Sequence, residues 1–112
     1  MKNNTAALCI FAATLALATT AASAALDDAT ALESMKKGGC NACHTIERKV
    51  VGPSYKEVAQ KRKSDAGAVA SLEKKVREGG KGEYGTIPMP PNPAAKISDA
   101  EIHELVAWIL TK

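Results

Sequence analysis

The chain has 112 residues, of which 15 are Lys or Arg and 12 are Asp or Glu, so its formal net charge is +3. This length is enough for one small domain. The charge is only mildly basic and aromatic residues make up 4% of the chain, a combination that argues against a nucleic-acid-binding protein.

The first 24 residues predict a cleaved secretory signal peptide. Met1-Lys2 supply a basic start, residues 6–18 form an apolar run, and Ala22-Ser23-Ala24 give the small-x-small cleavage pattern. The apolar run is too short for a comfortable membrane span. Cleavage before Ala25 would leave residues 25–112 as the mature domain. We therefore expect an exported, soluble, periplasmic protein without stable membrane insertion.

The first helix of the mature chain is predicted to begin near Asp27-Asp28. Their carboxylates suit an N-cap and the positive end of the helix dipole. Leu32 and Met35 are three residues apart and are expected to face inward. Gly38-Gly39 should end the helix.

A C-x-x-C-H run formed by Cys40, Cys43 and His44 follows directly. This run is the attachment signature of c-type haem. Positions three and four apart share one face of a helical turn, so the two thiols and the imidazole can converge on one flat ligand. The thiols would form thioethers with the two vinyl groups, and His44 Nε2 would reach the iron from the same side.

Two alternatives use the same cysteines. A dithiol redox motif normally lies in a βαβ unit, and the sequence contains no convincing strand. A structural zinc site normally needs four protein ligands. Because Cys9 falls within the signal, the mature chain has no third cysteine and only one other histidine, His103. Covalent haem is therefore the favoured interpretation.

Two more helices are predicted before a glycine-rich loop. Gly52-Pro53 signals a turn, and residues 55–61 form a short helix. Ser64-Asp65 can cap the next helix, which Gly79-Gly80 and Gly82 end. The residues expected to face inward from these two helices are Val58, Ala59, Val69, Leu72 and Val76.

Met89 is the best candidate for a second axial ligand. Pro88, Pro90 and Pro91 surround it, fix φ, and exclude regular helix or strand, so the loop can hold a thioether in one place. Met35 is expected to fill the core and His103 to lie at the surface. A thioether ligand would raise the reduction potential and close the iron to substrate. The alternative is that Met89 only anchors an apolar loop.

The last helix begins with a capping-box pattern at Ser98-Asp99-Ala100-Glu101. Its apolar positions lie on one stripe, the spacing of a helix that faces a core. Those positions are Ile102, Leu105, Val106, Ile109 and Leu110, and Trp108 adds the largest side chain. The whole mature chain is therefore predicted to be all-α, with about four short helices and long irregular loops.

Together these motifs resemble the small bacterial class I monohaem cytochromes c, specifically the cytochrome c-551 type. The resemblance rests on the C-x-x-C-H run, on the stretches 51–55 and 87–92, and on the terminal helix with Trp108-Ile109-Leu110. It covers nearly all of residues 25–112. It implies the class I cytochrome c fold, with four or so short helices around one covalent haem c that is ligated by His44 and Met89.

The resemblance also implies contacts around the haem. The Pro53 carbonyl would accept a hydrogen bond from His44 Nδ1, and Asn92 would donate toward the Met89 sulfur. Lys75 and Tyr84 occupy positions from which the family reaches a haem propionate, although the family more often has Arg and Trp there.

Two further departures from the family pattern concern packing. Met35 stands where these proteins commonly carry an aromatic residue in the first helix. Residues 93–97 are longer than the matching segment of the shortest relatives and are expected only to extend a surface loop.

The function expected from this resemblance is that of a one-electron carrier, which is not an enzyme and is monomeric. In relatives, the electron donors are quinol-oxidising complexes and the acceptors include nitrite reductases and terminal oxidases. Basic residues could form a positive rim that steers an acidic redox partner. One rival is a haem c sensor or enzyme subunit with an open sixth iron site. The other is a thiol oxidoreductase without haem.

Overall fold

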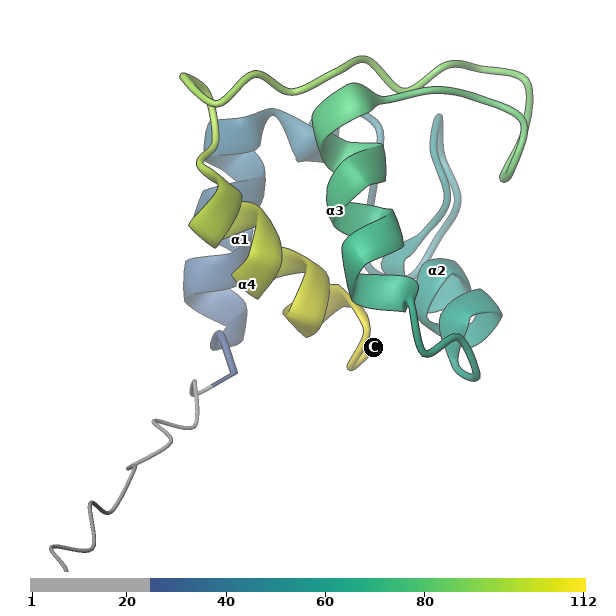
Figure 1. Cartoon of the computed structure of the whole chain (residues 1–112), viewed down its shortest axis with the longest axis horizontal. Helices are drawn as coiled ribbons and strands as arrows, with labels where there is room; N and C mark the ends of the chain where they lie inside the picture. The colour runs from purple at the N-terminus through teal and green to yellow at the C-terminus, as the bar shows by residue number, and fades with distance from the viewer. Residues whose placement is uncertain (1–24) are drawn as a thin grey trace, which may run out of the picture.

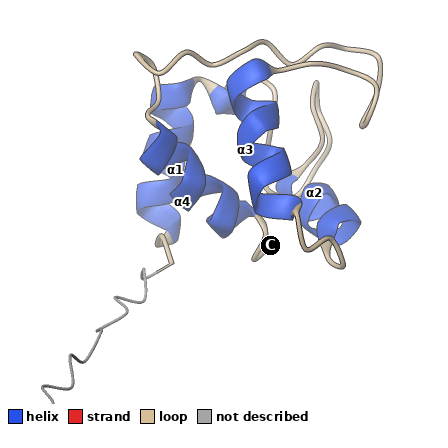
Figure 2. Cartoon of the chain, in the orientation of Figure 1, coloured by secondary structure: helices blue, strands red, loops and turns tan. Residues whose placement is uncertain are grey.

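The computed structural model describes residues 25–112, so the predicted signal peptide over residues 1–24 lies outside the described residues. Four helices make up this part: α1 (Asp28–Gly38), α2 (Tyr55–Arg62), α3 (Ala68–Glu78) and α4 (Asp99–Ile109). Within the described range the only β pairing is an isolated bridge between Gly80 and Met89. Figure 2 shows helices joined by loops. The prediction of an all-α fold with four short helices is confirmed.

α4 is the helix around which the others are arranged. It contacts α1, α2 and α3, and Figure 1 shows it between α1 and α3. The predicted capping box is present, since Ser98 and Glu101 bond each other's backbone amides. Most of the predicted apolar stripe is buried, and with it Trp108; the buried residues of α4 are Ile102, Leu105, Val106, Trp108 and Ile109.

α1 begins and ends where the sequence predicts. Asp27 accepts a hydrogen bond from the Thr30 amide, and Gly39 ends the helix with a left-handed φ of 72°. Met35 is 2% exposed, but the prediction for Leu32 is wrong because this side chain is 45% exposed. The buried face of α1 instead runs through Ala31, Met35 and Gly38. These residues have the i, i+4, i+7 spacing of one helix face, and Leu32 lies beside that face.

Of the two middle helices, α3 differs from prediction at its N-terminal end. The predicted burial of Val58 and Ala59 in α2 is confirmed. α3 starts at Ala68, so the expected cap at Ser64-Asp65 is wrong. The Asp65 carboxylate instead accepts a hydrogen bond from the amide of Gly67, two residues further on. The Asp65 carboxylate is therefore engaged in a local turn that precedes the helix, and it does not cap the first turn of α3.

The long loop from α3 to α4 runs away from α3, doubles back past its C-terminal end and then reaches α4 (Figure 1). The expectation that residues 93–97 only extend a surface loop needs correction. Residues 93–96 are exposed, but Ile97 is 1% exposed and belongs to the core cluster. The loop therefore ends with an apolar anchor immediately before α4.

Candidate functional site

The C-x-x-C-H run forms a tight turn directly after α1. Cys40–Ala42 make one 3-10 turn, and the Cys40 carbonyl oxygen accepts hydrogen bonds from the amides of Cys43 (3.1 Å) and His44 (2.9 Å). The side chains of Cys40, Cys43 and His44 all line one cavity. Within residues 25–112 both cysteines are free thiols. The convergence predicted from their spacing is thus present.

This cavity holds about 340 Å³, within the range of small-molecule and cofactor sites. Its walls come from α2, α3 and α4 and from the loops before α2 and after α3. Aliphatic side chains dominate these walls, among them Val58, Leu72, Val76, Leu105, Val106 and Ile109. The cavity is therefore suited to a large apolar group.

The imidazole of His44 is fixed by three neighbours. Its Nδ1 lies 2.8 Å from the Pro53 carbonyl oxygen, the contact that the family resemblance implies. Because a carbonyl can only accept, Nδ1 carries the proton and Nε2 keeps its lone pair for a ligand. The ring also stacks on Tyr55, with centroids 5.5 Å apart and planes inclined by 14°. At Gly52, an added Cβ would lie 2.6 Å from His44 Cε1.

Met89 enters the cavity from the loop after α3. Its backbone pairs with Gly80 through two hydrogen bonds of 2.9 Å, one in each direction. Gly79 has a φ of +72°, and an added Cβ there would clash with the Met89 carbonyl oxygen. Only glycine permits so close an approach of the two backbones. The position of Met89 is therefore set by the end of α3 as well as by its neighbouring prolines.

Asn92 belongs to the same loop as Met89 and bonds the backbone around it. Its Nδ2 donates to the carbonyl oxygens of Val76 (3.0 Å) and Pro90 (3.4 Å). These two bonds use both hydrogens of the amide. The structure thus gives Asn92 contacts that anchor the backbone, and its expected contact with the Met89 sulfur stays a prediction.

Lys75 and Tyr84, the two residues expected near a propionate, both line the cavity. The Tyr84 hydroxyl is buried beside the Arg62 guanidinium. Burial raises the pKa of Tyr84, so the group is a neutral donor near pH 7. Lys49 holds this segment by donating to the Tyr84 carbonyl at 2.8 Å. Lys75 and Tyr84 thus border the cavity, and contact of either residue with a haem propionate stays a prediction.

The donor set suits a covalently attached haem. Cys40 and Cys43 supply two thiols, His44 an imidazole and Met89 a thioether, and thioether and imidazole are both good ligands for haem iron. Burial raises the pKa of the Cys40 thiol. Catalytic C-x-x-C pairs have a lowered thiol pKa instead. The residues present therefore fit haem c, and the raised pKa of Cys40 differs from that of an activated thiol.

Three residues that shape this site were not singled out in the sequence: Tyr55 beneath His44, Gly79 beside Met89, and Arg77, which bonds the loop after Met89. The position of Tyr55 could have indicated its contact with His44, because Tyr55 lies two residues after Pro53, whose carbonyl orients the His44 ring. Gly79 was recognised only as a helix stop. Arg77 was counted only among the basic residues.

None of the helices in residues 25–112 is long and apolar enough to cross a membrane. The family model named cytochrome c matches residues 26–112. Cytochrome c-551 of Azotobacter vinelandii is 48% identical over 79 residues, covering 70% of this chain and 93% of that protein. Cytochrome c2 of Rubrivivax gelatinosus is 46% identical over 82 residues, covering 73% and 96%.

Solved structures agree with this similarity. The crystal structure of cytochrome c552 from Nitrosomonas europaea superposes with a TM-score of 0.66 at 44% identity, covering 71% of this chain and 96% of that one. The relatives are small electron-carrying cytochromes, and the family implies a covalently bound haem c. No catalytic family is indicated. The chain belongs to the cytochrome c family, as a small class I member of the cytochrome c-551 type.

Proposed function

We propose that the chain is a soluble periplasmic one-electron carrier. Its haem c would be attached through Cys40 and Cys43, with the iron ligated by His44 and Met89. When bound, the haem supplies an iron that takes up and releases one electron. Residues 1–24 would direct export as a signal peptide and would be removed from the mature protein.

The observation that carries this proposal is that both candidate ligands are held by the protein backbone. His44 is oriented by the Pro53 carbonyl at 2.8 Å, and Met89 is paired with Gly80. Ligands held in this way need little rearrangement between the ferric and ferrous states. Two protein ligands also leave no iron position for a substrate, which favours a carrier over an enzyme.

The partners would be other redox proteins. By analogy with relatives, the donor would be a quinol-oxidising complex and the acceptor a nitrite reductase or a terminal oxidase. Lys49, Lys75 and Lys81 line the cavity and place positive charge where an acidic partner would approach. We propose that the carrier works as a monomer.

The test is a visible spectrum of the ferric and ferrous protein after production in a host that matures c-type cytochromes. We expect sharp ferrous bands, haem that resists acid–acetone extraction, and the weak far-red ferric band of iron–thioether ligation. The mass should correspond to residues 25–112 plus one haem. Variants Cys40→Ser and His44→Ala serve as controls and should not give stable holoprotein.

The other outcomes lead to different functions. Covalent haem without the far-red band, together with ready binding of carbon monoxide, would support a sensor or enzyme subunit with an open sixth site. Two titratable thiols and no visible absorbance would support the thiol oxidoreductase. A mass that includes residues 1–24 would contradict export by signal cleavage.

A further inference from the structure

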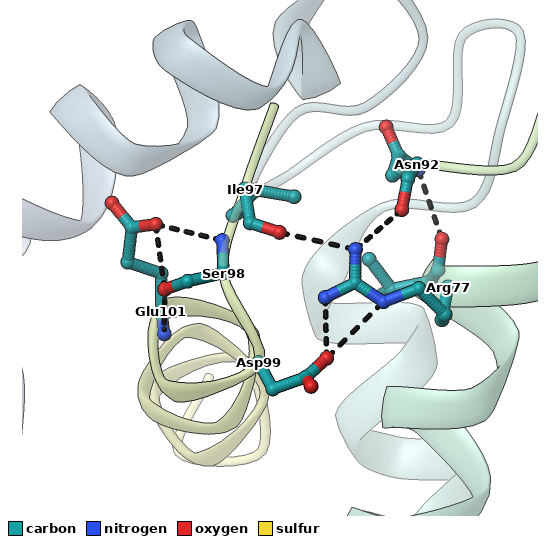
Figure 3. A network of polar contacts seen from close by, with 7 residues as sticks. Arg77, Asn92, Ile97, Ser98, Asp99 and Glu101 are labelled. Atoms are coloured by element: carbon teal, nitrogen blue, oxygen red, sulfur yellow. Dashed lines mark hydrogen bonds and ion pairs between the residues drawn. The ribbon is translucent and has the colours of Figure 1, made fainter. Parts of the chain in front are cut away.

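Arg77 in the last turn of α3 joins three parts of the chain. Its Nη1 donates to the carbonyl oxygens of Asn92 (2.6 Å) and Ile97 (3.0 Å). Its Nε and Nη2 reach Asp99 Oδ1 at 3.2 and 2.5 Å. Figure 3 shows the guanidinium between Asn92 and Ile97 of the loop and Asp99 at the start of α4. One side chain thus connects α3, the loop that carries Met89, and α4.

The backbone of α3 holds the same point of the loop. The Asn92 amide donates to the Arg77 carbonyl at 3.2 Å, and Asn92 Nδ2 donates to the Val76 carbonyl at 3.0 Å. Asn92 is 6% exposed and Ile97 is 1% exposed. Their carbonyls need a donor because unpaired buried carbonyls are costly. The loop between them is irregular, so regular secondary structure does not supply that donor. Arg77 supplies that donor for both.

Met89 lies between two anchors that both belong to the C-terminal end of α3. On one side it pairs with Gly80, just after the helix. On the other side Asn92 is bonded by Arg77, three residues after Met89. Pro90 and Pro91 lie between Met89 and Asn92, and their rings fix φ. A displacement of the Asn92 backbone should therefore also displace Met89, because the two prolines between them have little conformational freedom.

We propose that Arg77 is a positioning residue for Met89, which holds the thioether in the cavity although Arg77 does not itself line it. This inference rests on the proposed His44 and Met89 ligation. Arginine is suited to the role because its planar fork has five donors, enough for two carbonyls and one carboxylate at once. Lysine has a single ammonium on a flexible chain and cannot reproduce this geometry.

The experiment compares the holoproteins Arg77→Lys and Arg77→Ala with the wild type. Three quantities are measured: the temperature and pH at which the far-red ferric band disappears, the rate of carbon monoxide binding to the reduced protein, and the far-UV circular dichroism melting temperature. Removing the bonds to Asn92 and Ile97 should raise the population with Met89 displaced. We expect carbon monoxide to bind about tenfold faster to Arg77→Ala, which corresponds to about 1.4 kcal/mol, and Arg77→Lys to lie in between.

Two control variants separate positioning from general stability. Asp99→Ala removes the ion pair with Arg77 but leaves both carbonyl bonds, so carbon monoxide binding should stay at the wild-type rate. Lys37→Ala removes an ion pair of Lys37 with Glu101 in the same first turn of α4 without touching the Met89 loop. It should lower the melting temperature only.

The outcomes distinguish this inference from the proposed function. If the wild type lacks the far-red band, the ligation by Met89 fails and the inference fails with it. If the wild type has the band, but Arg77→Ala keeps it up to its own melting temperature and binds carbon monoxide at the wild-type rate, only the inference is overturned. Should Arg77→Ala not yield holoprotein, the same two results for Arg77→Lys decide.

Discussion

An added Cβ at Gly52 would lie 2.6 Å from Cε1 of His44 and 2.9 Å from its Nδ1, so the glycine lets the imidazole lie directly against the backbone. The same ring donates to Pro53 and stacks on Tyr55. Tyr55 in turn meets Trp108 of α4 edge-on, with centroids 6.0 Å apart. The orientation of the proposed iron ligand is therefore coupled to the core.

Gly52→Ala should displace the imidazole, since a contact of 2.6 Å cannot be accommodated without movement. The hydrogen bond to Pro53 would lengthen, and we expect a yield of holoprotein several-fold below the wild type or a changed reduction potential. The yield and the potential can be measured by absorbance and voltammetry. Gly67→Ala is the control, because its Cβ would meet its nearest atom, Asp65 Oδ1, only at 3.4 Å. Equal yields and potentials for the two variants would contradict the steric role of Gly52.

Met89→Ala should remove the proposed thioether ligand while leaving the other cavity walls in place. The reduction potential should fall on the order of 0.1 V, a fraction of the ~0.8 V that axial ligands span. The far-red ferric band should vanish, and the reduced protein should bind carbon monoxide. Met35→Leu is a matched control, since Met35 is 2% exposed in the core and its replacement should preserve the spectrum. An unchanged potential in Met89→Ala would exclude Met89 as the ligand.

More of the candidate site than of the helix packing could be predicted from the sequence. The C-x-x-C-H run and the proline-flanked Met89 are local patterns, and local geometry brings the cysteines and His44 together. Leu32 was misplaced because spacing alone does not say which face of a short helix meets α4. The Arg77 contacts were not predictable, because they join residues 15 to 22 positions apart through an irregular loop whose path no pattern encodes.

Glu101 in the capping box of α4 should make the free energy of unfolding depend on pH at the acid end of the range. Hydrogen bonds from Lys37 and from Ser98 lower the pKa of Glu101 to about 2, from an ordinary value of 4.5. A lowered carboxyl pKa stabilises the folded state above pH 4.5, and this stabilisation is lost as the pH falls toward 2.

Glu101→Gln should therefore destabilise the protein at pH 7, and the difference from the wild type should shrink between about pH 4.5 and pH 2. Denaturant unfolding across this range measures the difference. Glu104→Gln, an exposed residue of the same helix, is the control and should follow the wild type. A difference that is independent of pH would mean that the charge of Glu101 does not contribute.

Positive charge at the cavity should govern the rate at which an acidic redox partner associates. Lys81 is exposed and lines the cavity, whereas Lys74 is exposed on α3 and lies within 3.9 Å of Glu78. Lys81→Gln and Lys74→Gln change the net charge equally. Because exposed charges are screened over about 8 Å at physiological salt, the location of the charge should matter.

At low salt, we expect Lys81→Gln to slow electron transfer with an acidic partner roughly twofold, and Lys74→Gln to have little effect. The rate for the wild type should fall as salt rises, and the slope should be shallower for Lys81→Gln. Stopped-flow mixing at several ionic strengths measures both. Equal effects of the two variants would assign the steering to the net charge of the molecule, and a rate independent of salt would point to an apolar contact surface.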